Sequence, residues 1–293
     1  MPANLPFVSV IVPVRNDASR LELCIEALQR QTYPAEHLEI IIVDNGSSQP
    51  VRLPHAGRIA LRVIRDEGTS SYGARNRGIF VAKGDVLAFT DSDCIPKPEW
   101  LAKGVAYLTK LGPETVVGGE IEVFPQDEQA PTPTELYEMA CAFPQDLVIA
   151  KQGFAVTANL LVWRTVIVRI GPFNEKLRSG GDTEWGRRAV SRGTRLVFGG
   201  GATIRHPARR QLADLLRKAL RTTGGAHDQG LNRVTDLPRA IAPPVLTTIR
   251  VLKSKRLKGV LQRLKAIVIC IVLKYARLCF RLMFIVGVRK RWR

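Results

Sequence analysis

Two carboxylates close an apolar segment in the first half of the chain. Residues 86–90 are rich in β-forming side chains, and Asp91, Ser92 and Asp93 follow them directly. We predict a buried strand here, because turn residues precede the run and two prolines follow it. Residues two apart in extended chain point the same way, so Asp91 and Asp93 can face one ligand. A hard divalent cation such as Mg²⁺ or Mn²⁺, itself holding phosphate oxygens, relieves the repulsion between them. The same pattern also occurs in solvated turns and helix caps.

The predicted elements bring this acidic motif to one edge of a sheet. Strands are predicted over residues 7–12, 38–43, 59–64 and 86–90, with helices over 18–31 and 72–82. Strand alternating with helix predicts a Rossmann-like α/β fold with a doubly wound, mostly parallel sheet. Ligands bind such sheets at the carboxyl ends of the strands, which here lie at Pro13, Asp44 and Asp91.

The positive charge is concentrated in the last part of the chain. The net charge is +18, and residues 211–293 hold 19 of the 44 Lys and Arg with three acidic residues, a net of +16. Residues 1–210 are therefore nearly neutral, at +2. We predict that this basic helical extension associates with anionic lipid as amphipathic helices in the headgroup plane. Packing of the extension on the body or on a second subunit is the alternative.

The charges within the extension argue against a simple transmembrane span. Lys274, Arg277 and Arg281 interrupt its apolar runs. At helical spacing they are predicted to line one face. The opposite face would then hold Ile271, Leu273, Leu278 and Leu282.

The cysteines and the N-terminus bear on localisation. Five scattered cysteines without a C-x-x-C pair indicate neither a disulfide framework nor a zinc site, which favours a reducing compartment. No signal peptide is evident at the start of the sequence. We therefore expect a cytoplasmic protein, peripherally associated with the inner face of the cell membrane.

Four short motifs in a fixed order resemble the family 2 glycosyltransferases of bacterial type, which have the GT-A fold. The motifs are V-S-V-I-V-P-V-R-N from Val8, I-I-V-D-N-G-S-S from Ile41, A-R-N-R-G-I-x-x-A-K-G-D from Ala74 and F-T-D-S-D-C from Phe89. The similarity extends over residues 7–210. It implies a nucleotide-sugar donor, a divalent metal and inversion at the anomeric carbon.

The resemblance assigns expected roles to individual residues. It implies donor or nucleotide contacts for Pro13, Arg15, Asp44, Arg75, Asp91, Ser92, Thr157 and Asn159. It implies a metal site at Asp91 and Asp93, completed by His206, and diphosphate contacts from Arg205 and Arg209. Asp44 is also a good turn residue, Arg75 could be a solvated helix charge, and a lone histidine is often structural. Thr157 and Asn159 could equally be ordinary residues at the start of a strand.

The catalytic base is expected at the start of a helix in the second half. Two glycines precede Asp182 there, and by itself this acid could be a simple helix cap. Similar enzymes carry their base at this place, usually within Glu-Asp, but here Gly181 replaces the Glu. Asp182 is therefore the leading candidate and Glu184 the second.

The expected organisation has three parts. Residues 1–95 form a nucleotide-sugar-binding half, residues 96–210 an acceptor-binding half with a Pro-rich loop over 125–134, and residues 211–293 the basic extension. The expected function is sugar transfer to a hydroxyl acceptor in cell-surface glycan or glycolipid synthesis, with a lipid-linked glycan as the candidate acceptor. A nucleotidyltransferase is an alternative, although the first loop lacks its glycines. A nucleic-acid-binding protein is another, although base-stacking aromatics and known binding motifs are missing.

Overall fold

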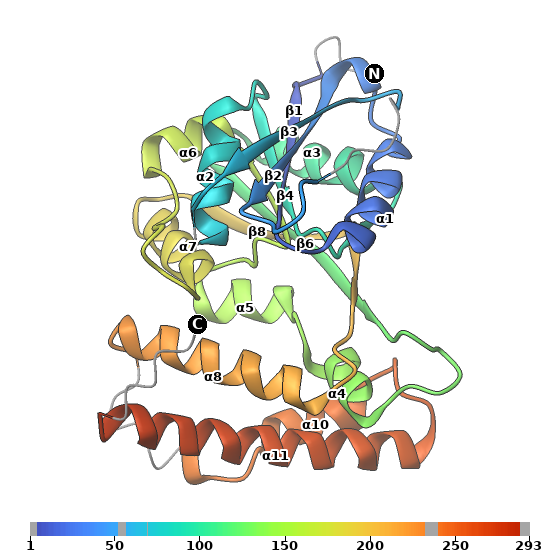
Figure 1. The fold of residues 1–293 in the computed structure, drawn as a ribbon, viewed down its shortest axis with the longest axis vertical. Helices are drawn as coiled ribbons and strands as arrows, with labels where there is room; N and C mark the ends of the chain where they lie inside the picture. The colour runs from blue at the N-terminus through green and yellow to red at the C-terminus, as the bar shows by residue number, and fades with distance from the viewer. Residues whose placement is uncertain (1–4, 52–56, 69, 232–239, 288–293) are drawn as a thin grey trace. The chain divides into compact units, whose positions relative to one another are not determined.

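The computed structural model describes residues 5–51, 57–68, 70–231 and 240–287 (Figure 1). The chain divides into two compact units. Unit 1 comprises Met1–Glu122, Pro144–Leu177 and Gly181–His206, and unit 2 comprises Val123–Phe143, Arg178–Gly180 and Pro207–Arg293. The basic extension thus folds together with Val123–Phe143, a segment that the sequence had placed in the acceptor-binding half. Parts of the extension, residues 232–239 and 288–293, lie outside the described residues.

The strands of the described residues form one sheet of order β3-β2-β1-β4-β7-β6-β8-β5. The strands are β1 Val8–Val14, β2 Leu38–Asn45, β3 Ala60–Asp66, β4 Val86–Thr90, β5 Ile95–Pro96, β6 Thr115–Phe124, β7 Asn159–Trp163 and β8 Arg195–Pro207. Pairing is parallel from β3 through β2 and β1 to β4, which confirms the predicted parallel half. Beyond β4 the pairs β4–β7, β7–β6 and β5–β8 are antiparallel.

Both faces of this sheet are covered, and every residue of the central strands β1, β2 and β4 is buried. Figure 1 shows helices α2, α6 and α7 on one side of the sheet and α1 and α3 on the other. Two glycines permit close contact: a Cβ on Gly78 of α2 would lie 2.5 Å from Ile11, and one on Gly104 of α3 would lie 2.5 Å from Leu161. The helices of unit 1 are α1 Ala18–Gln29, α2 Ser71–Val81, α3 Trp100–Leu111, α5 Gln145–Gln152, α6 Arg164–Ile170 and α7 Gly181–Ser191, with a short 3₁₀ turn at Ala35–His37.

The strand β6 is continuous across two adjacent glycines. Residues 115–124, which include Gly118 and Gly119, form one strand. A Cβ on Gly119 would lie 2.3 Å from the carbonyl oxygen of Ala202 and 2.5 Å from the side-chain amide of Asn159. The glycine therefore makes room for a crossing side chain and does not mark a turn.

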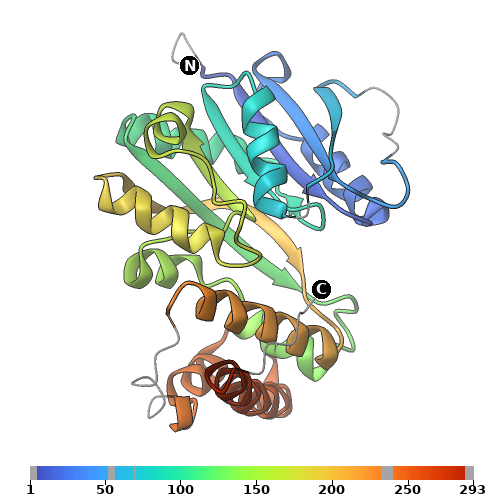
Figure 2. The same ribbon diagram turned by 60° about the vertical axis from the view of Figure 1, so that its left-hand side comes forward.

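Unit 2 is helical. It contains α4 Pro133–Cys141, α8 Leu212–Asp228, α10 Val245–Lys253 and α11 Gly259–Ile285. The helix α4 begins at Thr132 with a capping box, in which Thr132 and Glu135 satisfy each other's backbone N–H groups. Helix α11 packs against α4 and α8, as the neighbouring α8 and α11 in Figure 2 illustrate. Among the described residues, no helix has the length and apolar character needed to cross a membrane.

Candidate active site

The acidic motif lies in a turn at the end of β4, as predicted. The backbone N–H of Cys94 donates to the carbonyl of Asp91 at 3.1 Å and closes this turn. Asp17, in the loop after β1, accepts a hydrogen bond from Ser92 Oγ at 3.2 Å and one from Arg20 Nε at 2.7 Å. The Nη1 atom of Arg20 also lies 3.5 Å from Asp93 Oδ2. The start of α1 therefore holds the motif in place.

The two aspartates of the motif have different partners. Arg75, which is 4% exposed, donates from Nη2 to Asp91 Oδ1 and from Nη1 to the carbonyl of Ser71 at 3.1 Å. Asp93 instead faces His206, whose Nε2 lies 3.8 Å from Asp93 Oδ1. The structure thus brings the predicted residues together in two pairs, one an ion pair and one a carboxylate beside an imidazole.

The second pair fits a divalent metal ion. Asp93, Cys94 and His206 each offer one ligand atom, and these atoms lie within 4.8 Å of one another. Burial, followed by the charges of Asp91 and Asp93, raises the pKa of the Cys94 thiol well above its usual value. A thiol is also a soft ligand, which Mg²⁺ and Mn²⁺ bind less readily than carboxylate oxygen. The carboxylate and the imidazole remain as the donors, a set that suits Mn²⁺ and is acceptable to Mg²⁺.

Asp44 lies at the end of β2, beside the loop that follows β1. Its side chain is buried, with Oδ1 accepting from Ser47 N at 2.9 Å and Oδ2 lying 3.7 Å from Arg65 Nη1. Pro13 is buried in β1 opposite Val43, whereas Arg15 is exposed in the loop. Predicted contacts from the first two strands therefore meet at the same sheet edge as the acidic motif.

Asp182 lies in the first turn of α7, and its carboxylate is close to α2. Its Oδ1 accepts from Thr183 N at 2.9 Å and from the hydroxyl of Tyr72 at 3.4 Å. Burial raises the pKa of Asp182, and the Thr183 N–H and the charge of Arg75 offset only part of that rise. Such a carboxylate accepts a proton more readily than an exposed one.

Tyr72 joins the two halves of the site, although the sequence analysis did not select it. Its ring lies 5.7 Å from the guanidinium carbon of Arg75, and its hydroxyl reaches Asp182. Burial, with the charge of Asp182 second, raises the pKa of Tyr72 to about 12, so the phenol remains a donor. A signal was available, because Tyr72 and Arg75 are three residues apart in a predicted helix and must share a face.

Glu184, the second candidate base, is engaged elsewhere. Arg188 donates to both of its oxygens, at 2.8 Å from Nε and 3.1 Å from Nη2. Both carboxylate oxygens of Glu184 are therefore already hydrogen-bonded to a cation. The geometry therefore favours Asp182.

One other predicted contact, Asn159, has a different position from that expected. Asn159 is 0% exposed, and it accepts from Trp100 Nε1 and donates to the carbonyls of Glu120 and Ala202. It joins strands inside the core and has no exposed atom for a sugar, which corrects the prediction of a sugar contact. Thr157 is also buried, at 4% exposed.

The two predicted diphosphate contacts lie on either side of the unit boundary. Arg205 lies on β8 of unit 1, opposite Ile95 of β5. Arg209 belongs to unit 2, where its backbone N–H and its guanidinium both donate to Glu138. Glu138 is buried and the Arg209 side chain is 28% exposed, so the diphosphate contact of Arg209 stays a prediction.

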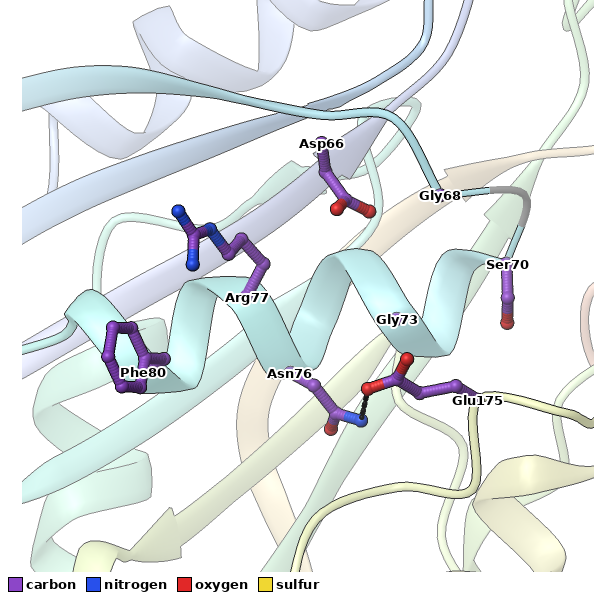
Figure 3. A pocket seen from close by; sticks show the side chains of 8 residues that line it. All are labelled: Asp66, Gly68, Ser70, Gly73, Asn76, Arg77, Phe80 and Glu175. Carbon is purple, nitrogen blue, oxygen red and sulfur yellow. Dashed lines mark hydrogen bonds between the residues drawn. The ribbon is translucent and has the colours of Figure 1, made fainter.

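A separate hollow of about 420 Å³ lies beside α2 (Figure 3). Asp66, Arg77 and Phe80 line it, and Glu175 closes it from the other side by accepting a hydrogen bond from Asn76 at 3.0 Å. None of the predicted site residues lines this hollow. Its two carboxylates and single arginine do not resemble a site for a phosphate-bearing donor.

The parallel strands, the carboxylates at their ends and the helix-borne Asp182 define an α/β enzyme of the GT-A type. The chain belongs to glycosyl transferase family 2, whose family model matches residues 9–170. This membership favours the transferase over the nucleotidyltransferase and the nucleic-acid-binding protein as the class of the chain.

Known proteins agree with this assignment. Glycosyltransferase AglE of Haloferax volcanii is 37% identical over 236 residues, which are 77% of this chain and 74% of that protein. The pre-mycofactocin glycosyltransferase of Mycobacterium tuberculosis is 28% identical over 72% of this chain and 45% of its own length. The mannosyltransferase PcManGT of Pyrobaculum calidifontis, solved with GDP-Man and Mn²⁺, aligns with a TM-score of 0.67 over 99% of this chain and 89% of its own, at 17% identity.

Proposed function

We propose that this enzyme transfers a sugar, with inversion, from a nucleoside diphosphate sugar to a hydroxyl acceptor. One observation carries the proposal. Asp182, a carboxylate with a raised pKa, lies next to the Tyr72 and Arg75 side chains that adjoin the acidic motif. A proton acceptor and a diphosphate-binding acidic motif on one sheet edge are the two groups that inverting transfer requires.

In this mechanism the site residues bind the nucleotide, orient the acidic motif or accept a proton. Asp44, buried at the end of β2, accepts a hydrogen bond from the nucleobase. Arg75 keeps Asp91 oriented towards the nucleotide, and Ser92 is fixed by Asp17. Asp182 takes the proton of the acceptor hydroxyl, which then attacks the anomeric carbon from the face opposite the diphosphate.

The leaving group needs positive charge. Asp93 and His206 would hold Mg²⁺ or Mn²⁺, and the ion would neutralise the charge that develops on the departing diphosphate. The fit of their carboxylate and imidazole to such an ion supports this role, and so does the Mn²⁺ present with the structurally similar mannosyltransferase. The proposal keeps Arg205, on β8, as a further diphosphate contact.

The proposal also covers the acceptor and the cellular location. The basic composition of residues 211–293 fits an enzyme held peripherally at the inner face of the cell membrane. A lipid-linked glycan in cell-surface glycan or glycolipid synthesis would be reached from that position.

The test is a screen of nucleotide sugars for metal-dependent hydrolysis by the purified full-length chain. Hydrolysis reports the donor without requiring the acceptor. In Asp93→Ala the hydrolysis should fall below detection and nucleotide binding in Mn²⁺ should weaken, because the ion loses a carboxylate ligand. Asp146→Ala, which removes an exposed carboxylate of α5, is the matched control and should behave like the parent chain. Hydrolysis that persists in Asp93→Ala and needs no metal would refute this assignment.

A further inference from the structure

Helix α11 has two apolar faces, and only one of them is covered within unit 2. Ala266, Ile269, Cys270 and Leu273 are buried in the core that α11 shares with α4 and α8. The sequence analysis had grouped Leu273 with Ile271 on the lipid side. In the structure Leu273 is 2% exposed and Ile271 is 42% exposed, so the two lie on different faces.

The uncovered face is a continuous stripe. Leu261, Leu264 and Val268 are 65%, 54% and 58% exposed. The same face continues towards the C-terminus of the helix through Ile271, Val272, Tyr275, Leu282 and Val286. Because the helix turns by about 100° per residue, these positions all fall on one side of it, roughly opposite the buried face.

Helix α10, which packs on α11, also exposes apolar side chains. Val245, Ile249 and Leu252 follow helical spacing and are 55%, 41% and 51% exposed, and Leu246 next to them is 84% exposed. We call the exposed apolar residues of α10 and α11 together the α10–α11 apolar surface. Isolated apolar residues are common on protein surfaces, but a set repeated along two packed helices marks an interaction site.

The charges around this surface identify its partner. Within the described part of the extension, residues 240–287 contain no acidic residue and ten basic ones. These are Arg250, Lys253, Lys255, Arg256, Lys258, Arg263, Lys265, Lys274, Arg277 and Arg281. A second copy of the chain would bring the same positive charges to the contact and be repelled. An anionic bilayer offers both an apolar interior for the stripe and negative headgroups for the basic side chains.

We propose that the α10–α11 apolar surface docks into the interfacial region of an anionic lipid bilayer, with α11 lying in the plane of the membrane. The proposal extends the proposed function by naming the face that binds lipid. It differs from the sequence prediction, because apolar residues outside the packed core make the contact and Leu273 does not. Apolar burial supplies affinity for any bilayer, and the basic residues add a preference for anionic lipid.

The experiment is vesicle flotation of the full-length chain with phosphatidylcholine vesicles and with vesicles containing 30% phosphatidylglycerol, at low and high salt. The variant Leu261→Gln/Leu264→Gln/Val268→Gln removes the N-terminal part of the stripe, and glutamine is compatible with a helix. We expect it to reduce partitioning roughly tenfold or more on both vesicle types, because three apolar side chains no longer enter the bilayer. The matched control is Val168→Gln on α6, a side chain that is 76% exposed in unit 1, and it should bind like the parent chain.

A second variant separates charge from apolar contact. Lys253→Gln/Lys255→Gln/Lys258→Gln should weaken binding to the anionic vesicles at low salt and leave neutral-vesicle binding unchanged. Parent protein that floats with neither vesicle type, or a stripe variant that floats like the parent, would overturn the docking proposal. So would a parent dimer, seen by sedimentation velocity, that the stripe variant dissociates while neither protein binds vesicles. Donor hydrolysis is measured without vesicles, so docking and sugar transfer can fail independently.

Discussion

Unit 1 and unit 2 each contain a carboxylate removed from solvent, and the two carboxylates have opposite properties. Asp182 in unit 1 accepts from a backbone N–H and a tyrosine hydroxyl, and burial raises its pKa. Burial acts in the same direction on Glu138 of unit 2, but Lys218 and Arg209 reverse it and lower the pKa of Glu138. Burial thus produces a proton acceptor where one cation offsets only part of the rise in pKa, and an ion pair where two cations reverse it.

The largest expected effect comes from removing the charge of Asp182, which tests its role as a proton acceptor. In Asp182→Asn turnover should fall by about 10²–10⁴-fold, because the amide keeps the shape of the side chain but cannot accept a proton. Donor affinity, measured by calorimetry with the nucleotide sugar, should be unchanged. The matched variant is Glu184→Gln, in which a carboxylate already paired with Arg188 is lost. If that variant is the one that loses turnover, the base has been assigned to the wrong residue.

The corresponding change in unit 2 should affect stability and not catalysis. Glu138→Gln leaves Arg209 and Lys218 without their counter-charge, and we expect the free energy of unfolding to fall by roughly 3 kcal/mol. Urea denaturation at pH 7 measures this, and hydrolysis per folded molecule should be preserved. Glu99→Gln, which breaks the exposed pair with Lys103, is the control and should change stability by less than about 0.5 kcal/mol.

The pH dependence of the free energy of unfolding provides a second test of the Glu138 ion pair. The pKa of Glu138 is lowered from 4.5, so its contribution to stability is present above that value and is lost as the pH falls through the lowered pKa. The difference between the parent and Glu138→Gln should therefore shrink in acid. A difference that stays constant from pH 7 to pH 3 would contradict the assigned ion pair.

The smallest expected effect comes from changing Tyr72, whose hydroxyl donates a hydrogen bond to the carboxylate of Asp182. Tyr72→Phe removes a hydrogen bond to the ionised form of Asp182, so the pKa of Asp182 should rise further. The acid limb of the turnover-against-pH profile should move to higher pH, with less than about a tenfold loss at neutral pH. Tyr107→Phe, which loses a bond to the Gly200 carbonyl, is the control. An unchanged profile in Tyr72→Phe would show that the phenol does not act on the base.

The sequence was sufficient for those parts of the site that depend on local pattern. Apolar runs ending in polar residues placed Asp44, Asp91 and Asp93 at strand ends, because each run and its end are contiguous in the chain. The parallel half of the sheet followed from the alternation of strands and helices. The position of Asp182 in the first turn of a helix followed from the glycines before it.

The remaining parts depended on contacts between distant segments. The core role of Asn159 comes from partners at Trp100, Glu120 and Ala202, and nothing near residue 159 reveals them. The pairing of Arg209 with Glu138 joins residues 71 positions apart. The three helices α4, α5 and α6 were also missed, since each has nine residues or fewer and too few turns to establish a clear apolar period.

The order of the sheet also bears on how the chain folds during synthesis. Strand β4 pairs with β1 on one side, but its other neighbour, β7, is not made until Trp163. Until then β4 is an edge strand, and all five of its residues are apolar or buried in the finished fold. Exposed edges of this kind pair readily with other chains. We therefore expect a fragment ending at residue 95, the half predicted from the sequence to bind the nucleotide sugar, to aggregate when it is produced alone.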